Sequence, residues 1–135
     1  MSPPASWITR RRRLLTAIAV VLWVLAFTAT HIPPSDLGHI AVSHRVLHVT
    51  GYAGLTFWIG LALIATGAPP RRRVVGIALV LAAYGVFDEL TQPIFGRTAS
   101  IRDWLADLVG IAVGLATAEL TALIALRRAA AQRKR

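Results

Sequence analysis

Four apolar runs, each close to the length of a membrane-crossing helix, constrain this chain more than any other feature. They cover residues 14–32, 46–66, 74–92 and 104–126. A helix needs about 20 apolar residues to cross the hydrocarbon core, and its backbone hydrogen bonds are then satisfied internally. No stretch alternates apolar and polar residues over about ten positions, as strands of a membrane barrel do. The sequence therefore predicts an all-α membrane protein, a bundle of four transmembrane helices in a single domain over residues 1–135.

The basic residues predict the orientation of this bundle. Most of the 15 lysines and arginines lie in the tails 1–13 and 127–135 and in the turn 71–73. Short basic segments stay in the cytoplasm, so we expect a multi-pass membrane protein with both termini inside (N-in/C-in). The net charge of +9 then reflects topology and attraction to anionic lipid headgroups. No basic stripe is interleaved with stacking aromatics, so the expected partner is the lipid bilayer and not nucleic acid.

Acidic residues gather where the third helix is predicted to end and the fourth to begin. The stretch VFDELTQPIFGRTASIRDWLAD, residues 86–107, holds most of the six acidic residues of the chain. They are Asp88, Glu89, Asp103 and Asp107. The four histidines, His31, His39, His44 and His48, flank the same predicted outer face. This face is therefore the candidate functional site.

Helical spacing groups these side chains. His48 and Tyr52 are four residues apart and share a helix face, and Gln92 lies three and four residues after Glu89 and Asp88. Asp103 and Asp107 are also four apart, a spacing at which two carboxylates repel by about 0.2–0.5 kcal/mol. The pair therefore needs a counter-charge: an arginine (Arg97 or Arg102), a histidinium, a bound cation or a proton.

Structural roles compete for several of these positions. Ser100 and Asp103 fit a capping box, with Ser100 as N-cap and Asp103 at the third helical position. Gly110 and Gly114 fit close helix packing, and Glu119 is expected to snorkel or to pair with a basic residue on the cytoplasmic side. The prolines Pro33-Pro34, Pro69-Pro70 and Pro93 mark the breaks between helices. No cofactor and no metal is expected, because there is no cysteine and no zinc-specific histidine signature.

Two blocks of this sequence resemble the VanZ-like family of small bacterial membrane proteins. The first is His44-Arg45-x-x-His48-x-x-x-Tyr52, where the family has D-K-x-x-H-x-x-x-Y. The second runs Asp88-Glu89-x-x-Gln92, Gly96-Arg97 and Asp103-x-x-x-Asp107-x-x-Gly110-x-x-x-Gly114, with Asp107 in place of the family's asparagine. The likeness covers about residues 36–115. It implies a four-helix protein of the cell envelope, and the member that names the family is associated with low-level resistance to the glycopeptide teicoplanin.

These observations support two main functional hypotheses. In the first, an extracytoplasmic polar pocket binds an amphiphile, such as a lipid-linked wall precursor or a lipophilic glycopeptide. Its binding residues would be Arg97, Gln92, Asp88, Asp107 and Tyr52. The alternative is a membrane-embedded acid/base enzyme acting on a lipid-linked substrate.

In that enzyme, Glu89 or Asp103 would be the acid/base, with His48 as its partner. Whether catalysis occurs is left open, and so is association of copies of the chain. A proton-coupled carrier is less favoured, because no charged pathway crosses the predicted bundle. Cleavage of the first helix as a signal peptide is also less favoured, since the run leads into Pro33-Pro34 without a small-residue cleavage site.

Overall fold

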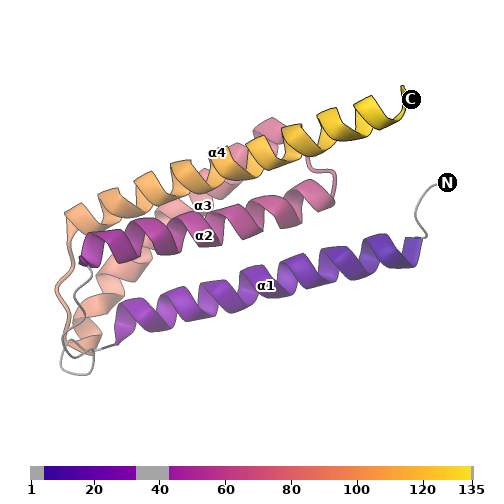
Figure 1. Ribbon diagram of the computed structural model, residues 1–135. Helices are drawn as coiled ribbons and strands as arrows, with labels where there is room; N and C mark the ends of the chain where they lie inside the picture. Colours follow the sequence, from indigo (N-terminus) through magenta and orange to yellow (C-terminus); the bar gives the residue numbers. More distant parts are fainter. Residues whose placement is uncertain (1–4, 33–42, 135) are drawn as a thin grey trace.

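The structure is a computed structural model that describes residues 5–32 and 43–134, with side chains from residue 10 onward (Figure 1). The predicted all-α fold is confirmed: the described chain forms long helices and no strand. All four α-helices are long and apolar enough to cross a membrane. The elements are α1 (Ala5–His31), α2 (His44–Ala65), α3 (Pro70–Thr91), the short 3-10 helix η2 (Gln92–Phe95) and α4 (Ile101–Gln132). The predicted break at Pro33-Pro34 and His39 lie outside the described residues.

Consecutive helices run antiparallel, so the chain passes up and down the bundle (Figure 1). The starts of α1 and α3 lie at one end together with the end of α4. We call it the basic end, because it holds Arg10–Arg13, Arg71–Arg73 and Arg127–Arg128. The opposite end, where α3 ends and α4 begins, holds Asp88, Glu89, Asp103 and Asp107, and we call it the acidic end.

The closest helix contact joins α2 to α4, and glycine makes it possible. A Cβ added at Gly110 would lie 2.5 Å from the Val49 carbonyl oxygen, and one at Gly114 would lie 2.5 Å from that of Ala53. Both distances are far below van der Waals contact, so a larger residue would push the helices apart. The predicted packing role of this glycine pair is confirmed, and it brings the first turns of α2 and α4 together.

Apolar side chains cover the outside of the bundle as well as its core. Leu55 and Leu81 are buried at 1% exposure, in a core with Tyr52, Ile77 and Ile111. Outward-facing residues such as Leu79, at 67% exposure, are equally apolar. A soluble bundle would place polar residues there, whereas a lipid-facing surface requires apolar ones.

At the basic end, the helices extend beyond the predicted transmembrane spans. The predicted tails 1–13 and 127–135 are largely helical, because α1 begins at Ala5 and α4 continues to Gln132. Arginine and alanine favour helix, so helices persist beyond the apolar runs. At the acidic end the prediction was closer, because α3 ends at Thr91 and Pro93 lies in η2. Gly96, with φ of +73°, then turns the chain toward α4.

Candidate functional site

The acidic end gathers predicted site residues from three helices and η2. His48 and Tyr52 come from α2, Asp88 and Glu89 from α3, Gln92 from η2, and Asp103 and Asp107 from α4. Most of them are buried, and Asp107 is fully so, at 0% exposure. The structure thus brings these separate segments together, a point that the sequence left open, and polar atoms buried this deeply require partners.

His48 and Asp107 form the central pair. Nδ1 of His48 lies 2.8 Å from Oδ1 of Asp107, and both side chains are almost completely buried. A carboxylate at this position fixes Nδ1 as the protonated nitrogen and leaves Nε2 as an acceptor. The pair thus orients one free ring nitrogen in a site with little water.

Two hydrogen bonds hold Glu89. The backbone N–H of Ser100 donates to Oε2 of Glu89 over 2.6 Å, and Nε2 of Gln92 donates to Oε1 over 3.3 Å. Ser100 is the N-cap residue of α4, so a carboxylate from α3 occupies the place that the third residue of a capping box normally takes. Glu89 thereby ties the end of α3 to the start of α4.

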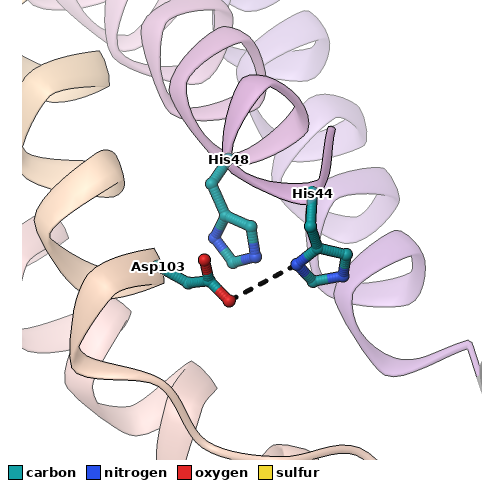
Figure 2. Close-up of side chains that lie close together, drawn as sticks. All are labelled: His44, His48 and Asp103. Atoms are coloured by element: carbon teal, nitrogen blue, oxygen red, sulfur yellow. Dashed lines mark ion pairs between the residues drawn. The ribbon is translucent and has the colours of Figure 1, made fainter. Parts of the chain in front are cut away.

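The predicted capping box of Ser100 and Asp103 is therefore wrong. The Ser100 side chain makes no capping hydrogen bond, and Glu89 holds the Ser100 N–H. Asp103 instead faces α2, where its Oδ2 lies 3.4 Å from Nδ1 of His44 (Figure 2). Glu89 takes the place predicted for Asp103 because η2 and Gly96 turn the chain so that Glu89 lies beside the first residues of α4.

Histidines, and not the predicted arginines, lie against the paired aspartates of α4. His44 contacts Asp103 and His48 contacts Asp107. Arg97 instead donates from Nη1 to the carbonyl oxygen of Ile32 over 2.9 Å, and Arg102 is exposed. Over the described ranges, neither arginine forms an ion pair with a carboxylate.

The last turn of α1 contributes two partners that were not among the predicted catalytic or binding residues. Thr30 donates to Oδ1 of Asp88 over 2.9 Å. His31 lies 3.7 Å from the same oxygen, and its Nε2 lies 2.8 Å from the hydroxyl of Thr91. The polar ending Thr-Ala-Thr-His of an otherwise apolar helix was the available signal. Through these contacts α1, the fourth helix of the bundle, also contributes side chains to the site around Asp88.

Three polar atoms in the centre of the site have no partner in the described part of the chain. They are Nε2 of His48, Oδ2 of Asp107 and the hydroxyl of Tyr52. Each is buried, so each loses its interaction with water without gaining a hydrogen bond. Such atoms are uncommon in native proteins and often mark a place where water, an ion or a ligand binds.

A cavity of about 390 Å³ opens beside these residues, between α1 and α2. Its walls are mainly small or apolar, with Ala26, Ala29 and Leu47 among them. Its polar lining is Thr30, His44, His48, Thr50, Tyr52 and Arg97. We call this cavity the α1–α2 pocket. Its volume lies in the range of small-molecule sites, about 300–1,000 Å³. An apolar wall with a few polar groups suits a ligand that has both an apolar and a charged part.

Glu119 is the acidic residue placed far from this site. It accepts hydrogen bonds from Nε and Nη2 of Arg73, whose Nη1 donates to the carbonyl oxygen of Ala68 over 2.7 Å. The predicted pairing with a basic residue is confirmed. This bidentate pair joins α3 to α4 near the basic end.

Comparison with family models, with curated proteins and with solved structures finds no match to this chain.

Proposed function

We propose that this chain is a VanZ-like integral membrane protein of the bacterial plasma membrane that binds the charged head of an amphiphile at its outward-facing acidic end. The gathering of Arg10–Arg13 and Arg71–Arg73 at the basic end supports a cytoplasmic location for that end. The residues that carry the family resemblance, from His44 to Gly114, include most of the polar side chains at the acidic end, among them His48, Glu89 and Asp107.

The α1–α2 pocket is the observation that carries this proposal. One arginine, Arg97, lines it, and its single described hydrogen bond is the one from Nη1 to Ile32. A guanidinium has five N–H donors, so most of them remain for a ligand. Arginine binds phosphate and carboxylate groups through two parallel hydrogen bonds. The apolar part of the pocket would contact the lipid chain, and Arg97 the anionic head.

The ligand class that fits is an anionic amphiphile: a lipid-linked wall precursor with its phosphates, or a lipophilic glycopeptide with its carboxylate. Both present a charged group next to a long apolar chain. His44 and Tyr52 add polar contacts at the same wall, so a headgroup with hydroxyl or amide groups is favoured over a bare fatty acid.

Binding to the purified protein tests this directly. The full chain in detergent micelles is titrated with a fluorescent lipid-linked wall precursor, and Arg97→Ala is expected to weaken binding roughly 10–100-fold. Arg102→Ala is the matched control, because Arg102 is an exposed arginine at the same end and does not line the pocket. Equal affinity of wild type and Arg97→Ala would remove the proposal.

A second measurement addresses the role in the cell. Deletion of the gene is expected to change tolerance to antibiotics that act on the cell wall. Complementation by wild type, but not by Arg97→Ala, should restore that tolerance. Unchanged tolerance to every such agent would contradict an envelope role.

The geometry of His48 favours one alternative, a membrane-embedded enzyme acting on a lipid-linked substrate. A buried carboxylate on Nδ1 with Nε2 free is the arrangement of a histidine general base. Glu89 suits the acid/base role less well, because both of its oxygens already accept hydrogen bonds. His48→Ala and Glu89→Gln, assayed with lipid-linked substrates, test this alternative. Turnover in wild type that is lost in His48→Ala and kept in Glu89→Gln would assign the base to His48.

A further inference from the structure

Three side chains at the acidic end are placed like ligands of one metal ion, and two of them, His44 and His48, also line the α1–α2 pocket. His44, His48 and Asp103 each offer a ligand atom within 4.8 Å of those of the other two. Figure 2 shows the two imidazoles of α2 and the carboxylate of α4 facing a common space. The His44–His48 spacing places both rings on one side of the first turns of α2, and the glycine contact between α2 and α4 brings Asp103 to them.

The free nitrogen of His48 points to a ligand independently of this grouping. His48 is only 4% exposed, and its Nε2 has no partner among the described residues. Because Nδ1 lies against Asp107, the nitrogen that remains is Nε2, and it lies on the side of His44 and Asp103 (Figure 2). Metal-binding histidines are typically held in this way, with a carboxylate on one nitrogen and the metal on the other.

The separation of His44 and Asp103 fits shared coordination. Nδ1 of His44 lies 3.4 Å from Oδ2 of Asp103, which is long for a charge-assisted hydrogen bond. Zinc–ligand bonds of about 2.1 Å at tetrahedral angles place two ligand atoms about 3.4 Å apart. A small movement of His48 toward this pair would complete a three-ligand set.

We propose that His44, His48 and Asp103 bind a Zn²⁺ ion, with Asp107 holding His48 in the required orientation. Two imidazoles and one carboxylate suit zinc better than Mg²⁺ or Ca²⁺, which prefer oxygen ligands. Three protein ligands would leave a fourth coordination position for water or a ligand oxygen. The site stands whether or not an amphiphile binds there.

The charges at the acidic end favour a cation at this position. Asp103 and Asp107 lie one helical turn apart, and neither contacts a lysine or arginine over the ranges that the structure describes. A divalent ion bound to Asp103 and to Nε2 of His48 would offset the charge of Asp103 directly, and that of Asp107 across the imidazole whose Nδ1 lies 2.8 Å from Oδ1 of Asp107. An overlapping group of His48, Glu89 and Asp107 is also close enough to hold an ion. It fits less well, because Glu89 already accepts two hydrogen bonds and Nδ1 of His48 is directed at Asp107.

Zinc binding to the purified chain tests the proposal. The full chain is purified in detergent through a tag without histidines, stripped with a chelator and titrated with Zn²⁺, and bound metal is measured by mass spectrometry after desalting. We expect one tightly bound ion per chain in wild type. Asp107→Asn should weaken binding about 10–100-fold, as loss of an orienting carboxylate does, and His44→Ala should weaken it further.

The controls separate this site from a general loss of folding. The His44 side chain is 41% exposed, so His44→Ala should keep the wild-type circular dichroism spectrum and elution volume. His31→Gln removes a histidine at the same end that lies outside the ligand set and should retain zinc, as should Glu89→Gln. Cobalt(II) should give the visible absorption bands of a tetrahedral site in wild type but not in His44→Ala.

Three results would overturn the proposal: no stoichiometric zinc in wild type, equal affinity of wild type and His44→Ala, or loss of zinc in Glu89→Gln with retention in His44→Ala. The last result would place the ion in the overlapping group. Zinc on Nε2 would also exclude His48 as a proton acceptor, so stoichiometric zinc at this site would contradict His48 as the base of the enzymatic alternative.

Discussion

The two ends of the bundle hold their carboxylates in different ways. Near the basic end, Glu119 receives two hydrogen bonds from Arg73, and the remaining terminal nitrogen of Arg73 donates to Ala68. At the acidic end, Asp88, Asp103 and Asp107 lie against histidines instead. One arrangement matches an anion with a permanent cation, and the other relies on side chains that are neutral or charged according to their surroundings.

This difference separates a structural contact from a candidate binding site. The Arg73–Glu119 pair uses its polar atoms internally and links two helices, so it has little capacity for a ligand. The acidic end leaves Nε2 of His48, Oδ2 of Asp107 and the hydroxyl of Tyr52 without described partners. Ionisable groups inside membrane segments are energetically costly and usually functional. The unpartnered atoms favour the acidic end, and not the Arg73–Glu119 pair, as the functional group of residues.

The largest expected effect on stability comes from a matched pair of substitutions, one near each end of the bundle: Glu119→Gln and Asp107→Asn. Glu119→Gln removes a charge-assisted hydrogen bond from a guanidinium whose side chain is 8% exposed, and it should lower the free energy of unfolding by about 2 kcal/mol. Asp107→Asn should change it by less than about 0.5 kcal/mol in zinc-free protein. The amide oxygen of the new side chain would still accept the hydrogen bond from His48. The amide nitrogen would take the place of Oδ2, which has no described partner.

Far-UV circular dichroism in mixed micelles titrated with a denaturing detergent measures both values. The double substitution Arg73→Met with Glu119→Leu is the control, because apolar replacement of a whole ion pair is often close to neutral. If Asp107→Asn lowers the free energy of unfolding more than Glu119→Gln does, the comparison is reversed, and the residues of the acidic end mainly stabilise the fold.

An intermediate effect is expected where the acidic end does serve the fold. Glu89→Ala removes the carboxylate that receives the Ser100 N–H and should lower the free energy of unfolding by about 1 kcal/mol, as loss of a helix cap does. Glu89→Gln keeps an acceptor oxygen and should lose less. Hydrogen exchange of the first amides of α4 gives a local readout, with faster exchange expected in Glu89→Ala. Unchanged exchange in this variant would show that Glu89 does not cap the helix.

The sequence predicted the features that depend on one helix at a time. The four spans, the shared face of His48 and Tyr52 and the packing role of Gly110 and Gly114 all follow from hydropathy and helical periodicity, and the structure confirms them. The location of the acids at one end followed from the number of spans, because four spans place the segment between the third and fourth helices opposite to both termini. These signals are local, so they do not depend on how the helices are rotated against one another.

The sequence could not predict which side chain pairs with which. Glu89 reaches Ser100 because η2 and Gly96 return the chain at a particular angle, and no spacing rule contains that angle. Thr30 and His31 join Asp88 because α1 lies beside the end of α3, across a distance of more than fifty residues in sequence. Metal binding was set aside for lack of a sequence signature, whereas the candidate ligands come from two helices and meet only in the bundle.

The smallest expected effect on stability comes from Asp103, and it sharpens the division within the acidic end itself. Asp103→Asn should change the free energy of unfolding by no more than about 0.5 kcal/mol, and in the stabilising direction, because it relieves repulsion with Asp107 one helical turn away. The same substitution should strongly reduce zinc affinity, because Asp103 is a proposed ligand. A loss of stability equal to that of Glu89→Ala would restore the capping role that the sequence predicted for Asp103. If Asp103→Asn keeps its stability but loses zinc, the two acids near the start of α4 have different roles: Glu89 caps the helix, and Asp103 binds the ion.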